Sequence, residues 1–547
     1  MHGLAARARH PPSRTAPGPR CRAVPQRHRP RRRSAGAAAA AGAAAAAAAP
    51  PPAGLDLAKC AALKAWVAGH CSPWPAQLEP ELLGPSGEHR MLAGAPIAEG
   101  QVLLQIPAKL FLTAESAARS GLCGQLVRGA ALNEWAALLL HLLCERAAGA
   151  DSFWAPYIAV LGDQSHHPLL WSSELQGQLT GSPMLRVLTD RLAQVQEDTE
   201  LLIAAGANEL EVARRWQQEA HSPLVTPASV AWAAAIVLGR SFQLDMGEPD
   251  MPLEADMSYY GTWQPRSEWV LALVPWADML RHSSEADEAA MLAFDPEACA
   301  AVAVAHTAYA PSAEVFDSHG PGLSPSDLLL DHGCVREDSA ANARYDAVLG
   351  EHLKPRGARN AALLSALEAL TGGPPALVLT PAGPDVTCLA ALRAGLASDA
   401  ELIKAGWRGG AGAAPPGGRS GGGGDVALCA RVMGRLSSPA SLATERRVLG
   451  VLANAVAAAA AAYQTSAEAD AAELAQLLQA QPGAGGGGVL RVGVLRALLA
   501  EKAALAGCGD VVSRWSAALE QLAAQGPPSA VTPEQLAALY GLDGDEA

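Results

Sequence analysis

Titratable side chains gather in one stretch of the chain, between Trp269 and Asp346, where short apolar runs give way to polar turns. The run Val270–Val274 ends at a proline, and a second run, Ala298–His306, is bounded by prolines on both sides. Polar residues at the ends of buried strands are how many sites are built. Imidazoles in such a place can accept, donate or carry protons near neutral pH. The side chains that we consider first are Asp278, Arg281, His282, His319, His332 and Cys334.

Two other chemistries fit these residue types less well. The three histidines and Cys334 are metal-ligand types, but their spacing matches no familiar zinc pattern. Asp278 and Asp331 are candidates for a carboxylate pair, although a structural or capping role is commoner for such residues. We therefore expect no metal ion at this place.

The order of these segments resembles the catalytic core of SET-domain methyltransferases. It is most similar to the branch that contains the Rubisco large-subunit lysine methyltransferase and its actin-histidine-methylating relatives. The first motif of that branch, P-x-x-D-x-x-N-H, corresponds to Pro275, Asp278, Arg281 and His282. The second reads G-E-x-V/L-x-x-x-Y-G, then S-N-x-E-L-L, then Y-G-F. It corresponds to residues 312–320, 324–329 and 332–334, which contain His319, Pro325 and His332.

The resemblance covers roughly residues 57–505 and implies an α+β fold. We expect a β-rich SET domain in residues 55–346 with a helical insertion around 125–225. An all-α substrate-binding domain should follow in 347–525, with glycine-rich linkers at 409–424 and 483–488 and a tail at 526–547. Helical spacing of apolar residues in Asn133–Gly149 and the Thr226-Pro227 cap support the insertion. The family's C-terminal pattern is matched by Glu445, Tyr463, Thr465, Glu468, Asp470, Arg496, Glu501 and Lys502.

The resemblance implies methyl transfer from S-adenosylmethionine to a lysine side chain of a protein. Such a displacement needs the donor and a neutral amine held in line, and a path for the amine proton. In the family one tyrosine lies beside the transferred methyl group and a second closes the lysine channel; they correspond to His319, the expected catalytic residue, and His332. By the same correspondence the cofactor is bound by Arg90, Met91, Leu92, Arg281 and His282, and the substrate by Arg240, Asp278 and His332.

Five positions differ from the family's residues where the family touches its cofactor or amine: Arg90, Arg281, His319, Pro325 and His332. An imidazole at position 319 can still orient an amine or act as a base, and Arg281 places a cation where the family has a neutral amide. Arg240 has two interpretations, a structural ion pair or a contact near a cofactor or substrate carboxylate. Two functions remain open: a protein-lysine N-methyltransferase, with histidine as a second acceptor, or a non-catalytic SET-fold protein-binding module.

The charge of the chain is unevenly distributed. Residues 1–54 contain ten Arg and no Asp, Glu or Lys, whereas the whole chain has a net charge of −13. This composition predicts an organelle transit peptide or a basic tail, and the resemblance favours the chloroplast stroma over the mitochondrion. Removing the segment leaves an acidic body, which argues against a nucleic-acid partner. We expect no membrane span, and the ten cysteines form no C-x-x-C motif.

Overall fold

A computed structural model describes residues 57–71, 74, 77–82, 89–246, 269–283, 291–319, 322–409, 422–479, 487–525 and 531–541. The predicted transit peptide or basic tail lies outside these residues, as do most of the two glycine-rich linkers and half of the tail at 526–547. Residues 422–424 and 487–488, predicted as linker, are instead the first residues of helices α14 (Gly422–Leu436) and α17 (Gly487–Ala524).

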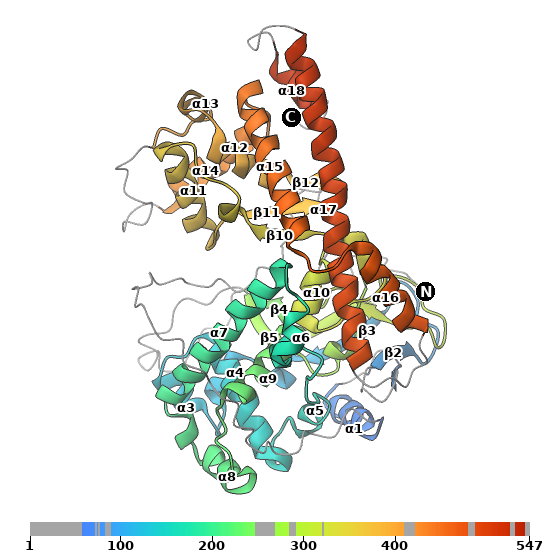
Figure 1. Cartoon of the computed structure of the whole chain (residues 1–547). Helices are drawn as coiled ribbons and strands as arrows, with labels where there is room; N and C mark the ends of the chain where they lie inside the picture. Colours follow the sequence, from blue (N-terminus) through green and yellow to red (C-terminus); the bar gives the residue numbers. More distant parts are fainter. Residues whose placement is uncertain are drawn as a thin grey trace, which may run out of the picture.

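The first part of the chain holds short strands in several small sheets (Figure 1). Strands β1 and β2 pair antiparallel, as do β4 and β5, and β8 lies antiparallel between β3 and β7. Strands β6 and β9 pair in parallel. The strands are β1 Leu78–Leu82, β2 His89–Ala93, β3 Val102–Pro107, β4 Ser241–Asp245, β5 Trp269–Leu273, β6 Arg281–His282, β7 Ala293–Asp295, β8 Ala300–Val304 and β9 Phe316–Asp317.

Helices fill the segment between β3 and β4, which includes the residues predicted as a helical insertion. After α1 (Leu57–Ala68), its helices are α2 Ala114–Arg119, α3 Gly124–Gly129, α4 Glu134–Ala148, α5 Ala155–Ile158, α6 Ser173–Gly177, α7 Pro183–Ala204, α8 Glu211–Ala220 and α9 Pro227–Arg240. Thr226 caps α9 through a capping box with Ser229, and Pro227 occupies the first turn. Helix α4 is buried around its whole circumference from Ala136 to Glu145, so it forms the centre of this part.

The second part is mainly helical. Helix α10, Pro325–His332, precedes it, and Leu329 and Leu330 of this helix belong to the apolar core of the first part. The elements of the second part are β10 Tyr345–Val348, α11 Ala358–Thr371, β11 Ala376–Thr380, β12 Gly383–Pro384, α12 Val386–Leu396, α13 Asp399–Lys404, α14 Gly422–Leu436, α15 Leu442–Ala462, α16 Ala467–Gln479, α17 Gly487–Ala524 and α18 Pro533–Leu539. Strands β10, β11 and β12 form an antiparallel sheet that the all-α expectation does not include. The run Ala376–Thr380 is only five residues long, too short for periodicity to separate strand from helix.

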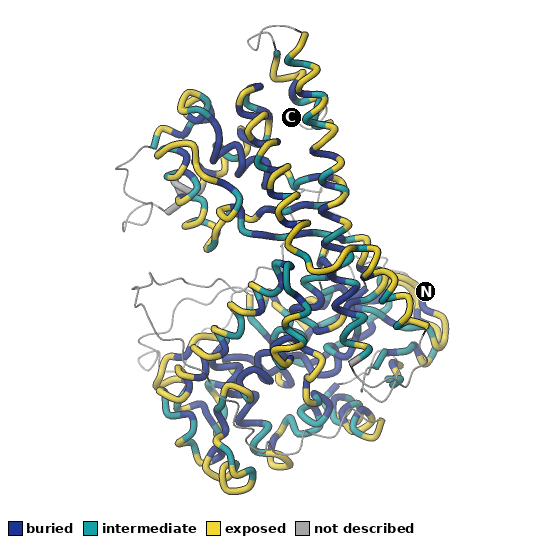
Figure 2. The backbone as a smooth tube through the Cα atoms, in the orientation of Figure 1, coloured by how far each residue is buried: buried dark blue, intermediate teal, exposed yellow. Residues whose placement is uncertain are grey.

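One long helix joins the two parts. Helix α17 runs along both (Figure 1), and its buried positions alternate with exposed ones along its length (Figure 2). Val494, Ala497 and Leu498 belong to the apolar core of the first part, whereas Leu505 and Val512 belong to that of the second. Helix α17 therefore contributes to both cores.

The second part also encloses a buried ion pair. The Arg393 and Glu445 side chains are fully buried, with Arg393 Nε 3.0 Å from Glu445 Oε1.

Among the described residues no single helix is long and apolar enough to cross a membrane. Helices α15 and α16 together, across a 45° bend, have the length and composition for a span.

Candidate active site

The buried carboxylate of Asp278 joins three elements of the first part. Asp278 lies in a single helical turn, Ala277–Met279, directly after β5. Tyr157, at the end of α5, donates a hydrogen bond from its hydroxyl to Asp278 Oδ2 at 2.7 Å. Arg240, the last residue of α9, places Nη1 3.4 Å from the same oxygen. Burial raises the pKa of Asp278, and the Arg240 charge opposes the rise. One of the two interpretations of Arg240, the ion pair, is thus present.

Three of the predicted site histidines form a stack. The parallel pairing of β6 and β9 brings His282 beside His319, whose backbone N–H donates to His282 Nδ1 at 3.1 Å. The rings of these two residues lie 5.3 Å apart between centroids, and the rings of His319 and His332 lie 4.6 Å apart. His319 Nδ1 is 3.4 Å from His332 Nε2. The two positions that correspond to the family's tyrosines therefore contact each other directly.

Backbone groups fix the protonated nitrogen of two of these rings. His332 Nδ1 lies 3.0 Å from the carbonyl oxygen of Gly239. Since a carbonyl oxygen can only accept a hydrogen bond, Nδ1 carries the proton of the neutral ring, and Nε2 presents its lone pair to His319. His282 accepts on Nδ1, so neutral His282 carries its proton on Nε2. Burial lowers the pKa of all three rings, that of His282 to about 4, and the nearby imidazoles lower the pKa values of His282 and His319 further. At neutral pH the stack is uncharged.

The cation at Arg281 is compensated by a neighbouring carboxylate. Arg281 Nε lies 2.8 Å and Nη2 2.6 Å from Glu314 Oε1. Arg336 approaches the same oxygen at 3.8 Å, also pairs with Asp338 and lies over the Phe316 ring. The sequence alone suggests an uncompensated cation at the position of a neutral amide, whereas the structure shows an ion-pair cluster.

The strand predicted to hold the cofactor lies next to this cluster. Leu92 in β2 faces Glu314 in an isolated bridge, and Val315 donates its N–H to the Met91 carbonyl at 2.8 Å. The Arg90 side chain pairs with Glu81 on β1. The predicted cofactor residues thus come from neighbouring segments, but the Arg90 guanidinium is directed to the neighbouring strand β1.

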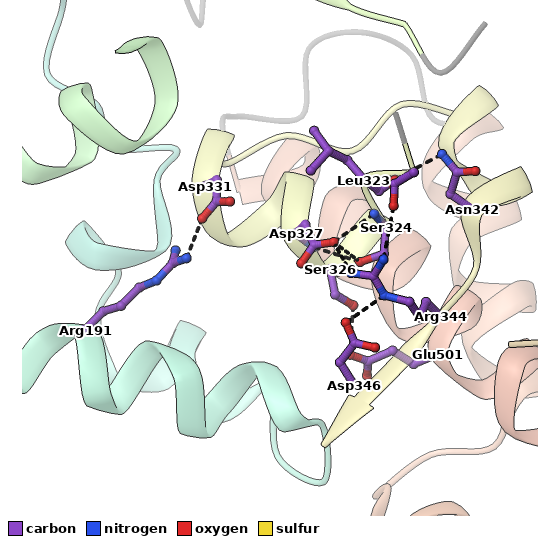
Figure 3. A network of polar contacts seen from close by, with 11 residues as sticks. Arg191, Leu323, Ser324, Ser326, Asp327, Asp331, Asn342, Arg344, Asp346 and Glu501 are labelled. Carbon is purple, nitrogen blue, oxygen red and sulfur yellow. Dashed lines mark hydrogen bonds and ion pairs between the residues drawn. The ribbon is translucent and has the colours of Figure 1, made fainter. Parts of the chain in front are cut away.

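Helix α10, which ends in His332, is anchored from several sides. Ser324 caps it and Pro325 occupies its first turn, where proline needs no backbone donor, so this departure from the family has a local structural reason. At its end, Gly333 has a φ of +68°, and a Cβ there would lie 2.8 Å from His166 Cδ2 and 3.0 Å from His167 Cα. Figure 3 shows the polar contacts that tie α10 to its neighbours: Arg191 with Asp331, Arg344 with Asp327 and Asp346, and Ser326 with Glu501.

Three buried polar atoms around the stack have no hydrogen-bond partner within the described part of the chain. They are His282 Nε2, Ser318 Oγ and Asp278 Oδ1. Buried polar groups are nearly always paired in folded proteins, so such atoms point to a ligand. His282 Nε2–H and the Ser318 hydroxyl can donate hydrogen bonds, and Asp278 Oδ1 can accept one. These atoms fit a ligand that has both donor and acceptor groups, such as a nucleoside with an amino-acid end. Within the described ranges, no group of three or more His, Cys, Asp or Glu side chains is arranged to hold a metal ion.

Sequence reasoning missed several contributors. Tyr157 is not among the predicted site residues, yet its hydroxyl donates a hydrogen bond to Asp278. Gly239 acts through its carbonyl, which no side-chain motif can show. Glu314 lies within the second motif, but no local sequence pattern indicates that it pairs with Arg281, which is 33 residues away in the chain.

Several methyltransferases are similar to this chain in sequence. No family model matches the chain. The chloroplastic Rubisco large-subunit N-methyltransferase of Nicotiana tabacum is 24% identical over 279 residues, which is 50% of this chain and 49% of that protein. The Pisum sativum enzyme of the same name is 25% identical over 36% of this chain and 33% of that protein. The N-lysine methyltransferase setd6 of Danio rerio is 27% identical over 43% of this chain and 48% of that protein. The chain thus aligns with about half or less of the length of these relatives.

The solved structures decide the fold. Rubisco LSMT bound to AdoMet superposes with a TM-score of 0.60 at 17% identity, over 89% of this chain and 97% of that one. The chain has the SET fold. The structure of the LSMT SET domain bound to lysine and AdoHcy superposes with a TM-score of 0.61 at 17% identity, over 85% of this chain and 93% of that one. The predicted resemblance and α+β fold are confirmed.

Proposed function

We propose that the protein is an S-adenosylmethionine-dependent protein-lysine N-methyltransferase. The observation that carries the proposal is the neutral His282–His319–His332 stack, in which His319 and His332 occupy the positions predicted to correspond to two family tyrosines and His282 that of the family's histidine. A protonated imidazole there would repel both a sulfonium and a lysine cation. Burial keeps the rings uncharged, which is the state that tolerates the donor and accepts a hydrogen bond from an amine.

The cofactor would be held between β2 and the β6–β9 pair. S-adenosylmethionine supplies the methyl group when bound. The unpartnered His282 Nε2–H and the Ser318 hydroxyl are available to its polar atoms, together with main-chain groups of Met91 and Leu92. Glu314 compensates Arg281, so the sulfonium would meet an ion pair rather than a free positive charge.

His319 is the proposed catalytic residue. It would orient the lysine amine by accepting its hydrogen bond, and His332 would support His319 from the opposite side, itself held by the Gly239 carbonyl. The Tyr157–Asp278–Arg240 group, with Asp278 fully buried, fixes the turn that precedes β6. Arg240 and Asp278 remain proposed substrate-side residues.

The finer assignment follows the relatives. We propose a chloroplast protein such as the Rubisco large subunit as substrate, since two relatives carry that activity and compartment in their names. We further propose that residues 347–525 form the substrate-binding domain and residues 1–54 a transit peptide. The non-catalytic alternative is less favoured, because Arg281 and Arg90 each have a carboxylate partner and the stack keeps hydrogen-bonding groups at the tyrosine positions.

A transfer assay tests the proposal. The full chain would be incubated with S-adenosylmethionine labelled in its methyl group and with chloroplast extract, and labelled proteins would be hydrolysed for amino-acid analysis. The expected result is ε-N-methyllysine in a protein band that is absent without the chain. Binding of the cofactor without transfer to any extract protein would support the protein-binding module instead.

A further inference from the structure

A cavity of about 340 Å³ lies where the helical insertion meets the C-terminal helices. Its walls come from the turn between α6 and α7, from the connection between α15 and α16, and from α17 (Figure 1). This volume lies in the range of ligand-binding pockets. None of the three stacked histidines lines the cavity, so it is separate from the candidate active site. Four uncharged polar side chains line it: Gln178, Thr180, Gln464 and Thr465.

The two sides of the cavity are in direct contact beside it. Gly181 of the α6–α7 turn has a φ of +92°, and a Cβ there would lie 2.7 Å from Tyr463 Cα, which belongs to the α15–α16 connection. Arg491 of α17 lines the cavity and donates from Nη1 to Gln178 Oε1 at 3.2 Å. The cavity is therefore built into the folded junction between the insertion and the C-terminal helices.

The charged groups at the cavity already have partners. Arg491 Nε and Nη2 each lie 2.7 Å from an oxygen of Glu473. Lys502 donates to Thr465 Oγ1 at 3.2 Å and forms an ion pair with Asp470. A charged ligand would have to compete with one of these ion pairs, so the site favours an uncharged one.

On the insertion side, one donor and one acceptor are left for a ligand. Gln178 Oε1 accepts the hydrogen bond from Arg491, which leaves the Nε2 amide group to donate. Thr180 Oγ1 donates to the Gly177 carbonyl at 2.6 Å, which leaves its lone pairs to accept.

The C-terminal side offers the same two kinds of group. Thr465 Oγ1 accepts from Lys502, so its own hydroxyl proton is left to donate. Gln464 is exposed, and its carboxamide can both donate and accept. Tyr463 and Leu498 add an aromatic and an apolar surface to the lining. A ligand that fits this set is uncharged and carries donors and acceptors close together.

We propose that this cavity binds an uncharged polar stretch of the protein substrate, an inference that rests on the methyltransferase function proposed above. Peptide groups and the side chains of Asn, Gln, Ser and Thr combine a donor with an acceptor, which is what the cavity can pair. Because two parts of the chain form the walls, the substrate is recognised where the insertion and the C-terminal helices meet. The histidine stack then acts on the lysine, and the cavity selects the sequence around it.

Binding of the full chain to immobilised peptides tests the proposal. The peptides share one background and differ in a central run of Asn, Gln, Ser and Thr, of Ala and Leu, or of Asp and Lys. We expect the wild type to bind the uncharged polar set at least about tenfold more tightly than the other two, the effect of one or two hydrogen bonds. No such preference in the wild type would overturn the proposal, and so would binding of sorbitol without it, because the occupant would then be a polyol.

Two variants that fill the cavity from opposite sides are Thr180→Trp and Gln464→Trp. Each should abolish the preference for the polar peptides and leave the affinity for S-adenosylhomocysteine within about twofold, since no predicted cofactor residue lines the cavity. Thr189→Trp is the matched control, because Thr189 is exposed on α7 and its hydroxyl also donates to a backbone carbonyl, that of Leu185 at 2.7 Å. A preference that survives in both filled variants would overturn the proposal.

The transfer assay separates this inference from the proposed function. With chloroplast extract as acceptor, both filled variants should need about tenfold more extract for half-maximal labelling, at an unchanged maximal rate. A peptide preference that the variants abolish, without transfer in any protein, would support the cavity and refute the methyltransferase. Transfer whose dependence on extract is the same in the wild type and both variants would support the methyltransferase and overturn the inference.

Discussion

His319 and His332 occupy the positions predicted to correspond to two family tyrosines, and their rings contact each other. His319 Nδ1 faces His332 Nε2 at 3.4 Å, and the Gly239 carbonyl sets the protonated nitrogen of His332. A change in either ring alters the hydrogen bonding of the other. Effects of substitutions at the two positions should therefore be non-additive.

Replacing the central ring tests its proposed role. His319→Ala should lower kcat for methyl transfer by about a hundredfold, because the amine loses its acceptor and its position. The affinity for S-adenosylhomocysteine should change by less than about threefold. His221→Asn, an exposed histidine at the end of α8, is the matched control and should be neutral. An unchanged rate in His319→Ala would remove His319 from the chemistry.

The buried His282 ring predicts acid sensitivity. Its pKa is about 4 in the folded chain and about 6.5 when unfolded, so the stability it contributes is present above pH 6.5 and is lost as the pH falls through 4. The loss approaches about 3 kcal/mol. His282→Gln should therefore lose less stability than the wild type between pH 7 and 4.5, measured by thermal unfolding. Parallel curves for the two proteins would contradict this.

At the scale of elements, α10 positions His332 for the stack. Its first turn is built by Ser324 and Pro325, and its end is packed tightly on the segment that contains His166 and His167. His167 Nε2 reaches the Asp331 carbonyl at 3.1 Å, so the same segment also bonds to the last turn. The position of the His332 ring thus depends on the close packing of Gly333 against His166 and His167.

Adding a methyl group at the end of α10 should displace it. Gly333→Ala combines an unfavourable φ with contacts below 3 Å, so we expect a loss of about 2 kcal/mol or more and a lower transfer rate. Gly206→Ala has a similar φ of +91° and no atom within 4 Å of the new Cβ, so it reports the backbone cost alone. Equal melting temperatures for the two variants would mean that the close contact with His166 adds nothing to the stability cost of the substitution.

The sequence predicted elements better than the contacts between them. Caps and spacing located α4 and α9, because those signals are local. The parallel β6–β9 pair has two residues in each strand, and no local pattern reveals a pair that short. The neutralisation of Arg281 by Glu314 depends on that pairing, so the charge at the site was misjudged from sequence.

At the scale of the whole molecule, Glu501 links the two parts of the chain. It lies on α17, is 1% exposed, and accepts hydrogen bonds from Ser326 of α10 at 2.8 Å and from the Tyr463 hydroxyl at 2.7 Å. Ser326 and His332 belong to the same helix, α10. The carboxyl group therefore connects the helix of the histidine stack to the C-terminal helices.

This link predicts a stability change in the opposite direction to that of His282. Burial raises the pKa of Glu501 to about 7, so its contribution is fully present below the unfolded value near 4.5 and is lost as the pH rises through 7. Glu501→Gln should melt at a higher temperature than the wild type at pH 8 and near the wild-type temperature at pH 4.5. A variant that is less stable at pH 8 would show that the ionised carboxylate is favourable there.

The central claim is that this SET fold still binds its cofactor with histidines and arginines at the altered positions. The most direct measurement is a calorimetric titration of the full chain with S-adenosylhomocysteine, which needs no knowledge of the protein substrate. We predict a single site with a micromolar Kd, about −8 kcal/mol. The absence of binding at millimolar ligand would contradict the methyltransferase proposal and leave the chain as a SET-fold binding protein.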